Sequence, residues 1–172
     1  MEGSRVDRHH RTVPLHLDPE LRRDALSMAL YVALGLLGAL SLFDRSLSGT
    51  DVRIVETIWG ITVGLVLAHV FAFVVAAHVA GQGSLRRHDG EAAVAHLLGG
   101  IAVAVVATAA ALVVRDEGAL RAVRLVLVVF IGTVGYLVRR SNGASRKGAV
   151  LFGFVTVVVA LIIANIKINL SH

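Results

Sequence analysis

The sequence predicts an all-α membrane protein, a polytopic bundle of about five transmembrane helices. Of its 172 residues, 56% are hydrophobic and only 17% are charged, whereas a typical soluble domain has about 25% charged residues. The charged residues are also nearly absent from five long apolar segments. A helix needs about 20 predominantly apolar residues to cross a bilayer, and each segment is close to that length or exceeds it.

The five segments are joined by short connections, so we expect neighbouring spans to run antiparallel in one compact bundle. Together with the residues between them, they form one transmembrane domain over residues 18–172. The expected spans cover residues 25–43, 54–80, 92–114, 119–138 and 148–166.

The residues before the first span divide into a tail and a helix start. Residues 1–17 contain three Arg and three His and show no apolar period, so we expect them to form a flexible cytoplasmic tail. A helix start follows this tail. Asp18 is a capping residue, Pro19 is a proline at the first helical position, and Glu20 is an acid in the first turn. The first helix is therefore predicted to begin there, in the headgroup region.

The distribution of Lys and Arg predicts the orientation, because cytoplasmic loops carry an excess of these residues. Eleven of the 17 lie in the N-terminal segment or in the second and fourth connections, and the other six lie on the opposite side. With an odd number of spans, the N-terminus is then cytoplasmic and the C-terminus extracytoplasmic. The ratio of 15 Arg to 2 Lys is a bias associated with GC-rich bacterial genomes, so we expect the inner (plasma) membrane of a bacterial cell.

Small residues recur along three of the spans. In the second span Gly60, Gly64 and Ala68 follow one another at an interval of four, which places them on one helical face. Gly100 in the third span and Gly132 in the fourth lie in comparable rows. Such rows allow helix backbones to approach closely in lipid. They predict either packing faces within the chain or contacts between subunits.

Two charged residues lie just inside the extracytoplasmic ends of their spans. Glu56 lies just inside the start of the second span, one turn before Trp59, and Arg124 lies about one turn inside the fourth. Because ionisable groups in lipid often mark pathways, these two are candidates for a charge pair or for the mouth of a pathway. The alternative is structural: Glu56 lies in the interface with Trp59, and Arg124 extends its side chain towards water.

His69 and His96 are the candidates deepest in the membrane. Counted along their helices, both fall in the inner half of the bilayer, and His69 lies a few ångströms deeper. A hydrogen-bonded pair of these residues is therefore geometrically reasonable. Neutral imidazole can shuttle protons, sense pH or bind a metal, but it can equally serve as a structural hydrogen-bonding group between helices.

The sequence offers little for enzyme chemistry. It has no Cys, no Gly-x-Ser-x-Gly motif, no phosphate-binding glycine loop and no cluster of carboxylates within a span. The histidines are too dispersed for a recognised zinc pattern, so the identity of any metal stays unknown. We predict no cofactor. An enzyme is unsupported.

The function predicted from these residues is an oligomeric ion or proton channel or transporter, with His69 and Glu56 as its leading polar sites. Five spans are too few for two inverted repeats, so we expect a homo-oligomer. The net charge of +5 indicates anionic lipid at the cytoplasmic face as a partner, and not nucleic acid. The alternatives are a non-catalytic accessory or assembly subunit and, third, a haem-binding redox subunit.

Overall fold

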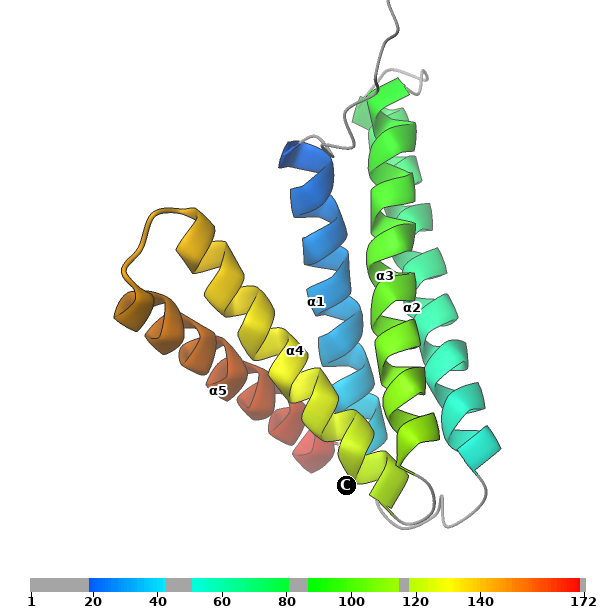
Figure 1. The fold of residues 1–172 in the computed structure, drawn as a ribbon. Coiled ribbons are helices and arrows are strands. Elements are labelled where there is room, and N and C mark those ends of the chain that lie inside the picture. The colour runs from blue at the N-terminus through cyan, green and yellow to red at the C-terminus, as the bar shows by residue number, and fades with distance from the viewer. Residues whose placement is uncertain (1–18, 43–50, 81–86, 115–117, 171–172) are drawn as a thin grey trace, which may run out of the picture.

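The computed structural model describes residues 19–42, 51–80, 87–114 and 118–170. Each of the five helices in these ranges is long and apolar enough to cross a membrane, which confirms the prediction of a multi-pass, all-helical membrane protein. The predicted tail at residues 1–17 lies outside the described residues. The helices are α1 (Pro19–Leu42), α2 (Asp51–Ala80), α3 (Arg87–Val113), α4 (Ala119–Ser141) and α5 (Arg146–Leu170) (Figure 1).

All five helices are longer than the apolar spans that the sequence predicts. The first begins at Pro19, the position favoured by its fixed backbone angle, and α3 begins at Arg87, five residues before its apolar stretch. Hydropathy marks only the lipid-facing length, whereas backbone hydrogen bonding continues the helix into the headgroup layer. Successive helices run in opposite directions, so α1 begins and α5 ends at opposite ends of the bundle (Figure 1).

α1 is the central helix of the bundle and contacts all four of the others. Its buried face repeats every four residues, at Met28, Val32, Leu36 and Leu40, each with at most 1% of its surface exposed. These side chains belong to one apolar core that also includes residues of α2, α3, α4 and α5. The core therefore lies around α1.

Glycines on α3 allow α1 and α2 to approach closely. A Cβ atom at Gly99 would overlap the backbone carbonyl of Ala25 in α1. One at Gly100 would overlap the side chain of Val66 in α2 and lie 3.5 Å from Val32 in α1. The three helices thus meet at one level. They can do so because Gly99 and Gly100 of α3 have no side chains that would keep the neighbouring helices apart.

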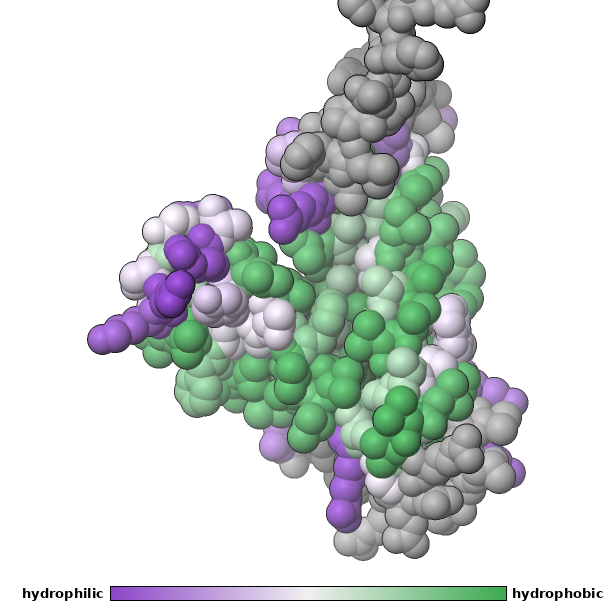
Figure 2. All heavy atoms as spheres, viewed as in Figure 1, coloured by the Kyte–Doolittle hydropathy of each residue, from purple (hydrophilic) through white to green (hydrophobic). Residues whose placement is uncertain are grey.

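α4 and α5 form an antiparallel hairpin that also packs through glycines. A Cβ atom at Gly153 would lie 2.7 Å from the carbonyl oxygen of Gly132, and one at Gly135 would lie 2.7 Å from the hydroxyl of Thr156. The hairpin leans away from α1 at the end where α1 begins and approaches it at the other end (Figure 1). Apolar side chains cover most of the visible sides of the helices, and hydrophilic ones gather at their ends (Figure 2).

Candidate functional site

The two histidines expected in the membrane interior lie in contact. The ring centroids of His69 on α2 and His96 on α3 are 4.8 Å apart, with the rings nearly perpendicular. Tyr31 of α1 lies 5.6 Å from His69, and Phe73 of α2 lies 5.2 Å from His96, both between ring centroids. We call these four side chains the histidine cluster. It joins the three helices α1, α2 and α3.

The local sequence and the glycine contacts together build this cluster. His69 and Phe73 are four residues apart on α2 and therefore share a helical face. His96 precedes Gly99 and Gly100 by about one turn of α3. Since those glycines draw α3 against α1 and α2, the imidazole of His96 is brought against the faces of both neighbours.

His96 is the buried member of the pair. Only 6% of its surface is exposed, and its Nδ1 atom has no hydrogen-bond partner among the described residues. His69 is half-buried. Asp24, one turn into α1, lies close enough to act electrostatically on His96. Buried polar nitrogens nearly always have a partner in proteins, so the Nδ1 atom of His96 is an exception among the described residues.

The spacing of the two imidazoles does not fit a haem held between them. Two histidines that ligate one iron from opposite sides hold their ring centroids roughly 6 Å apart, given metal–nitrogen bonds of about 2 Å. At 4.8 Å, the rings of His69 and His96 leave no room for a haem plane between them. In the described part of the chain, no three histidine or carboxylate side chains come together in a way that could hold a metal ion.

Arg124 and Glu56 lie apart from this cluster, and they do not pair with each other. The guanidinium Nη2 of Arg124 donates a hydrogen bond to the carbonyl of Leu40, in the last turn of α1. That carbonyl is one of the last four of its helix, which have no partner within the helix. Arg124 thus caps α1. Glu56 lies on the exposed face of α2, so the charge pair that the sequence allowed is not formed within the chain.

The row of small residues on α2 does not pack within the chain. Gly60, Gly64 and Ala68 are exposed, and a Cβ atom at either glycine would meet nothing within 4 Å. Among the described residues these three form no close packing face, because α2 lies at the edge of the bundle and turns its other face to α3 and α1. Their contact with another subunit stays a prediction. Gly100 and Gly132, in contrast, lie in close contact between helices.

Sequence reasoning missed two aromatic members of the cluster. Phe73 follows His69 by one helical turn, and this spacing was the signal that could have identified it. Tyr31 carries no such signal, because only the packing of α1 against α2 brings its ring to His69.

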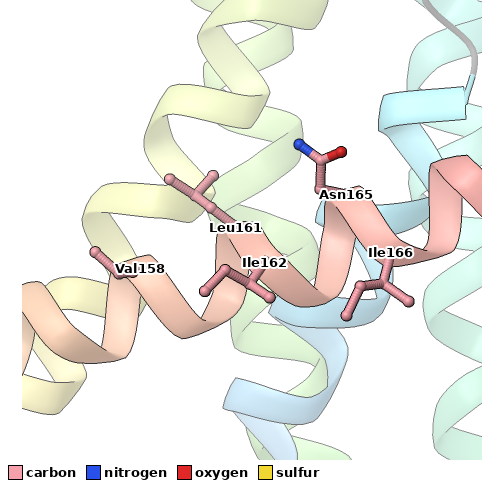
Figure 3. Close-up of a pocket in the computed structure, with 5 residues that line it drawn as sticks. All are labelled: Val158, Leu161, Ile162, Asn165 and Ile166. Atoms are coloured by element: carbon pink, nitrogen blue, oxygen red, sulfur yellow. The ribbon is translucent and has the colours of Figure 1, made fainter.

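A shallow hollow on α5 is apolar and carries no charged side chain. Figure 3 shows the five residues that line it, all from α5, with Asn165 as the single polar member. The hollow lies within the candidate span of this helix. It is therefore a crevice of the apolar surface and not a polar site. Its lining residues are Val158, Leu161, Ile162, Asn165 and Ile166.

Comparisons with known proteins identify no relative: no family model, no curated protein and no solved structure matches this chain. The arrangement of its own side chains is therefore the basis on which function is argued. Within that arrangement, the histidine cluster is the only polar contact between different helices that lies deep in the described spans and combines titratable rings.

Replacing Arg124 should destabilise the protein through α1. We expect Arg124→Gln to lower the free energy of unfolding by about 1–3 kcal/mol, because a hydrogen bond from a charged donor is lost and the carbonyl of Leu40 is left without it. Thermal unfolding in detergent measures the change. Arg121→Gln is the matched control, since Arg121 lies three residues before Arg124 on α4 and its side chain is exposed. Equal losses in the two variants would contradict the capping role.

Proposed function

We propose that this protein is an oligomeric proton channel or transporter, with His69 and His96 as the proton-carrying groups. The observation that carries the proposal is the contact between these two rings, at 4.8 Å, between helices that span the membrane. Free imidazole gains and loses protons near neutral pH and can serve as a proton shuttle, so a contact between two imidazoles supports a site at which protons are carried. Ionisable groups inside membrane spans most often belong to such relays.

Further buried polar atoms extend from the histidines towards the opposite end of the bundle. The hydroxyls of Thr62 on α2 and Thr108 on α3 are buried and have no hydrogen-bond partner among the described residues. Thr62 lies seven residues from His69, or about 10 Å along the helix, and Thr108 lies twelve residues from His96, or about 18 Å. Polar groups at several depths support a path across the bundle.

Glu56 lies near the start of α2, at the end of the bundle towards which Thr62 and Thr108 extend the path. Its position supports an entrance to the path at that end. Glu56 belongs to the exposed row of α2 that includes Gly60, Gly64 and Ala68. In an oligomer that packs through this row, carboxylates from several copies would be close together and would attract cations to the mouth. The small residues would allow the backbones of neighbouring copies to approach.

Flux across liposomes tests the role of the histidine cluster. We expect His69→Ala and His96→Ala to lower proton flux to the level of protein-free vesicles, because each removes one of the two proton-carrying rings. A pH-sensitive dye inside the vesicles measures the flux under an imposed potential. His78→Ala is the control, since His78 is exposed on the last turn of α2 and should conduct like the unchanged protein. Glu56→Gln should give a smaller loss.

Unaltered flux in the correctly folded variants, or no flux in the unchanged protein under any gradient, would contradict the proposal. Circular dichroism and gel filtration of each variant establish whether the fold is kept.

We also propose that the end of the bundle where α1 begins faces the cytoplasm of a bacterial cell, next to anionic lipid of the inner membrane. The larger share of Lys and Arg at this end supports the orientation. Four of these cations, Arg139, Arg140, Arg146 and Lys147, flank the turn between α4 and α5.

Cysteine labelling tests this orientation directly, because the chain has no Cys of its own. The Asn142→Cys variant, in the α4–α5 turn, should react with a membrane-impermeant thiol reagent only after the membrane has been made permeable or inverted, so that the reagent reaches the cytoplasmic face. Val114 lies just past the end of α3 and is 40% exposed. The Val114→Cys variant should react in intact spheroplasts, in which the outer face of the inner membrane is accessible. The reverse pattern of labelling would show that the orientation is inverted.

The exposed row on α2 also favours a second candidate function, a non-catalytic accessory or assembly subunit. A Cβ atom at Gly60 or Gly64 would meet no described residue within 4 Å, and Ala68 is exposed. A face suited to close helix contact can dock on a different protein as well as on a second copy. In this case the histidine cluster would hold α1, α2 and α3 together and would carry no protons.

Disulfide cross-linking separates the two candidates. We expect Gly60→Cys to form a linked dimer of this chain under mild oxidation in the membrane, because the small row is proposed to face a second copy. Leu125→Cys, on α4 and 65% exposed, is the control for random collision in the bilayer. If Gly60→Cys links no more readily than Leu125→Cys, the accessory-subunit function is favoured.

A further inference from the structure

The turn between α4 and α5 gathers cations without acidic neighbours in the hairpin. Arg139 and Arg140 end α4, Arg146 and Lys147 begin α5, and all four side chains are exposed. From Gly118 to the C-terminus the sequence contains no Asp or Glu, so no carboxylate of the hairpin can neutralise them. Hydrophilic side chains accordingly gather at the tip of the hairpin, next to an apolar surface (Figure 2).

Backbone hydrogen bonds fix the position of these cations. Gly143 has a φ of 79°, which reverses the chain, and its N–H donates to the carbonyl of Arg140 at 3.2 Å. The N–H of Ala144 donates to the carbonyl of Arg139 at 3.4 Å. The guanidinium of Arg140 donates in turn to the carbonyl of Ala144 at 3.1 Å. Arg140 thus belongs to the turn, and Arg139, Arg146 and Lys147 present their charges outwards.

An open groove of about 490 Å³ continues from these cations along the outer face of α5. Arg146 and Lys147 form its polar end, and Val150, Leu151 and Phe154 form the rest. Each of the three apolar side chains is at least 60% exposed. The groove is therefore cationic at one end and apolar over the remaining length, and among the described residues only those of α5 line it.

The length of the groove along α5 is comparable with the thickness of one membrane leaflet. The candidate span of α5 begins at Arg146, which places the cations at the boundary of the apolar layer. Phe154 lies eight residues further on, or about 12 Å further along the helix at a rise of about 1.5 Å per residue. One leaflet contributes roughly half of a hydrocarbon core that is about 30 Å thick. A molecule that fills the groove thus has an anionic head and a hydrocarbon chain.

We infer that this groove binds one anionic phospholipid. Its phosphate contacts the guanidinium of Arg146 and the ammonium of Lys147, both strong donors to phosphate, and Arg139 adds positive charge nearby. One acyl chain lies along Val150 and Phe154. A zwitterionic lipid offers the same chain but carries a cationic group towards the arginines, which disfavours it. The inference deepens the proposed association with anionic lipid at this face, and it is independent of proton transfer.

Lipid retention tests the site on the full-length protein. Purified protein is equilibrated with equal amounts of phosphatidylglycerol and phosphatidylcholine, and native mass spectrometry counts the lipids that stay bound. The unchanged protein should retain phosphatidylglycerol in preference. The double variant R146Q/K147Q should lower this preference by roughly tenfold or more, because each cation near a membrane surface contributes about 1 kcal/mol to binding anionic lipid.

Two matched variants keep the test decisive. R53Q/R121Q removes the same charge from two exposed arginines at the opposite end of the bundle and should leave the preference unchanged. R146K/K147R keeps both charges and should also keep the preference, which separates loss of cations from loss of fold.

An unchanged preference in R146Q/K147Q would overturn the inference. An equal loss in R53Q/R121Q would also overturn it, because net charge and not the groove would then select the lipid. If millimolar inorganic phosphate displaced the bound lipid, the site would be one for free phosphate instead. Because retention is measured without a gradient, each of these failures leaves the histidine proposal unaffected.

Discussion

The close approach of α3 to α1 at Gly99 is the contact on which the rest of the bundle depends. A side chain there would overlap the backbone of Ala25. Association in lipid lacks the hydrophobic driving force available in water, because lipid tails are as apolar as the helices, and tight packing must replace it. The contact sets α1 in the centre of the bundle, within reach of all four other helices.

The same contact brings the polar groups together and leaves one helix face open. With α3 drawn against α1 and α2, His96 is buried beside His69, and Tyr31 reaches the pair from α1. α2 is held at the edge by its contacts with α3 and α1, so its row of small residues, among them Gly60 and Gly64, turns outwards. The polar cluster and the outward face thus arise from one packing arrangement.

The hairpin of α4 and α5 is a second unit with a different chemistry. Its helices are joined by glycine contacts, as at Gly153, and it is tied to α1 at one end, where Arg124 caps the last turn. At its other end it leans away from α1 (Figure 1) and presents cations above an apolar face. Titratable rings lie in the three-helix part and exposed cations in the hairpin, so the two proposed roles, proton transfer and binding of anionic lipid, can be altered separately.

The sequence by itself determined the five helices, because an apolar segment of spanning length has no other stable form in lipid. The positions of His69 and His96 along their helices also predicted that the two residues lie at a similar level. Only the tertiary structure decided that Gly60 faces outwards, that Arg124 caps α1 and that Tyr31 joins the histidines. The physical reason is that side chains facing lipid and side chains facing the core are both apolar. A sequence therefore shows which residues share a helical face but not which helix that face meets.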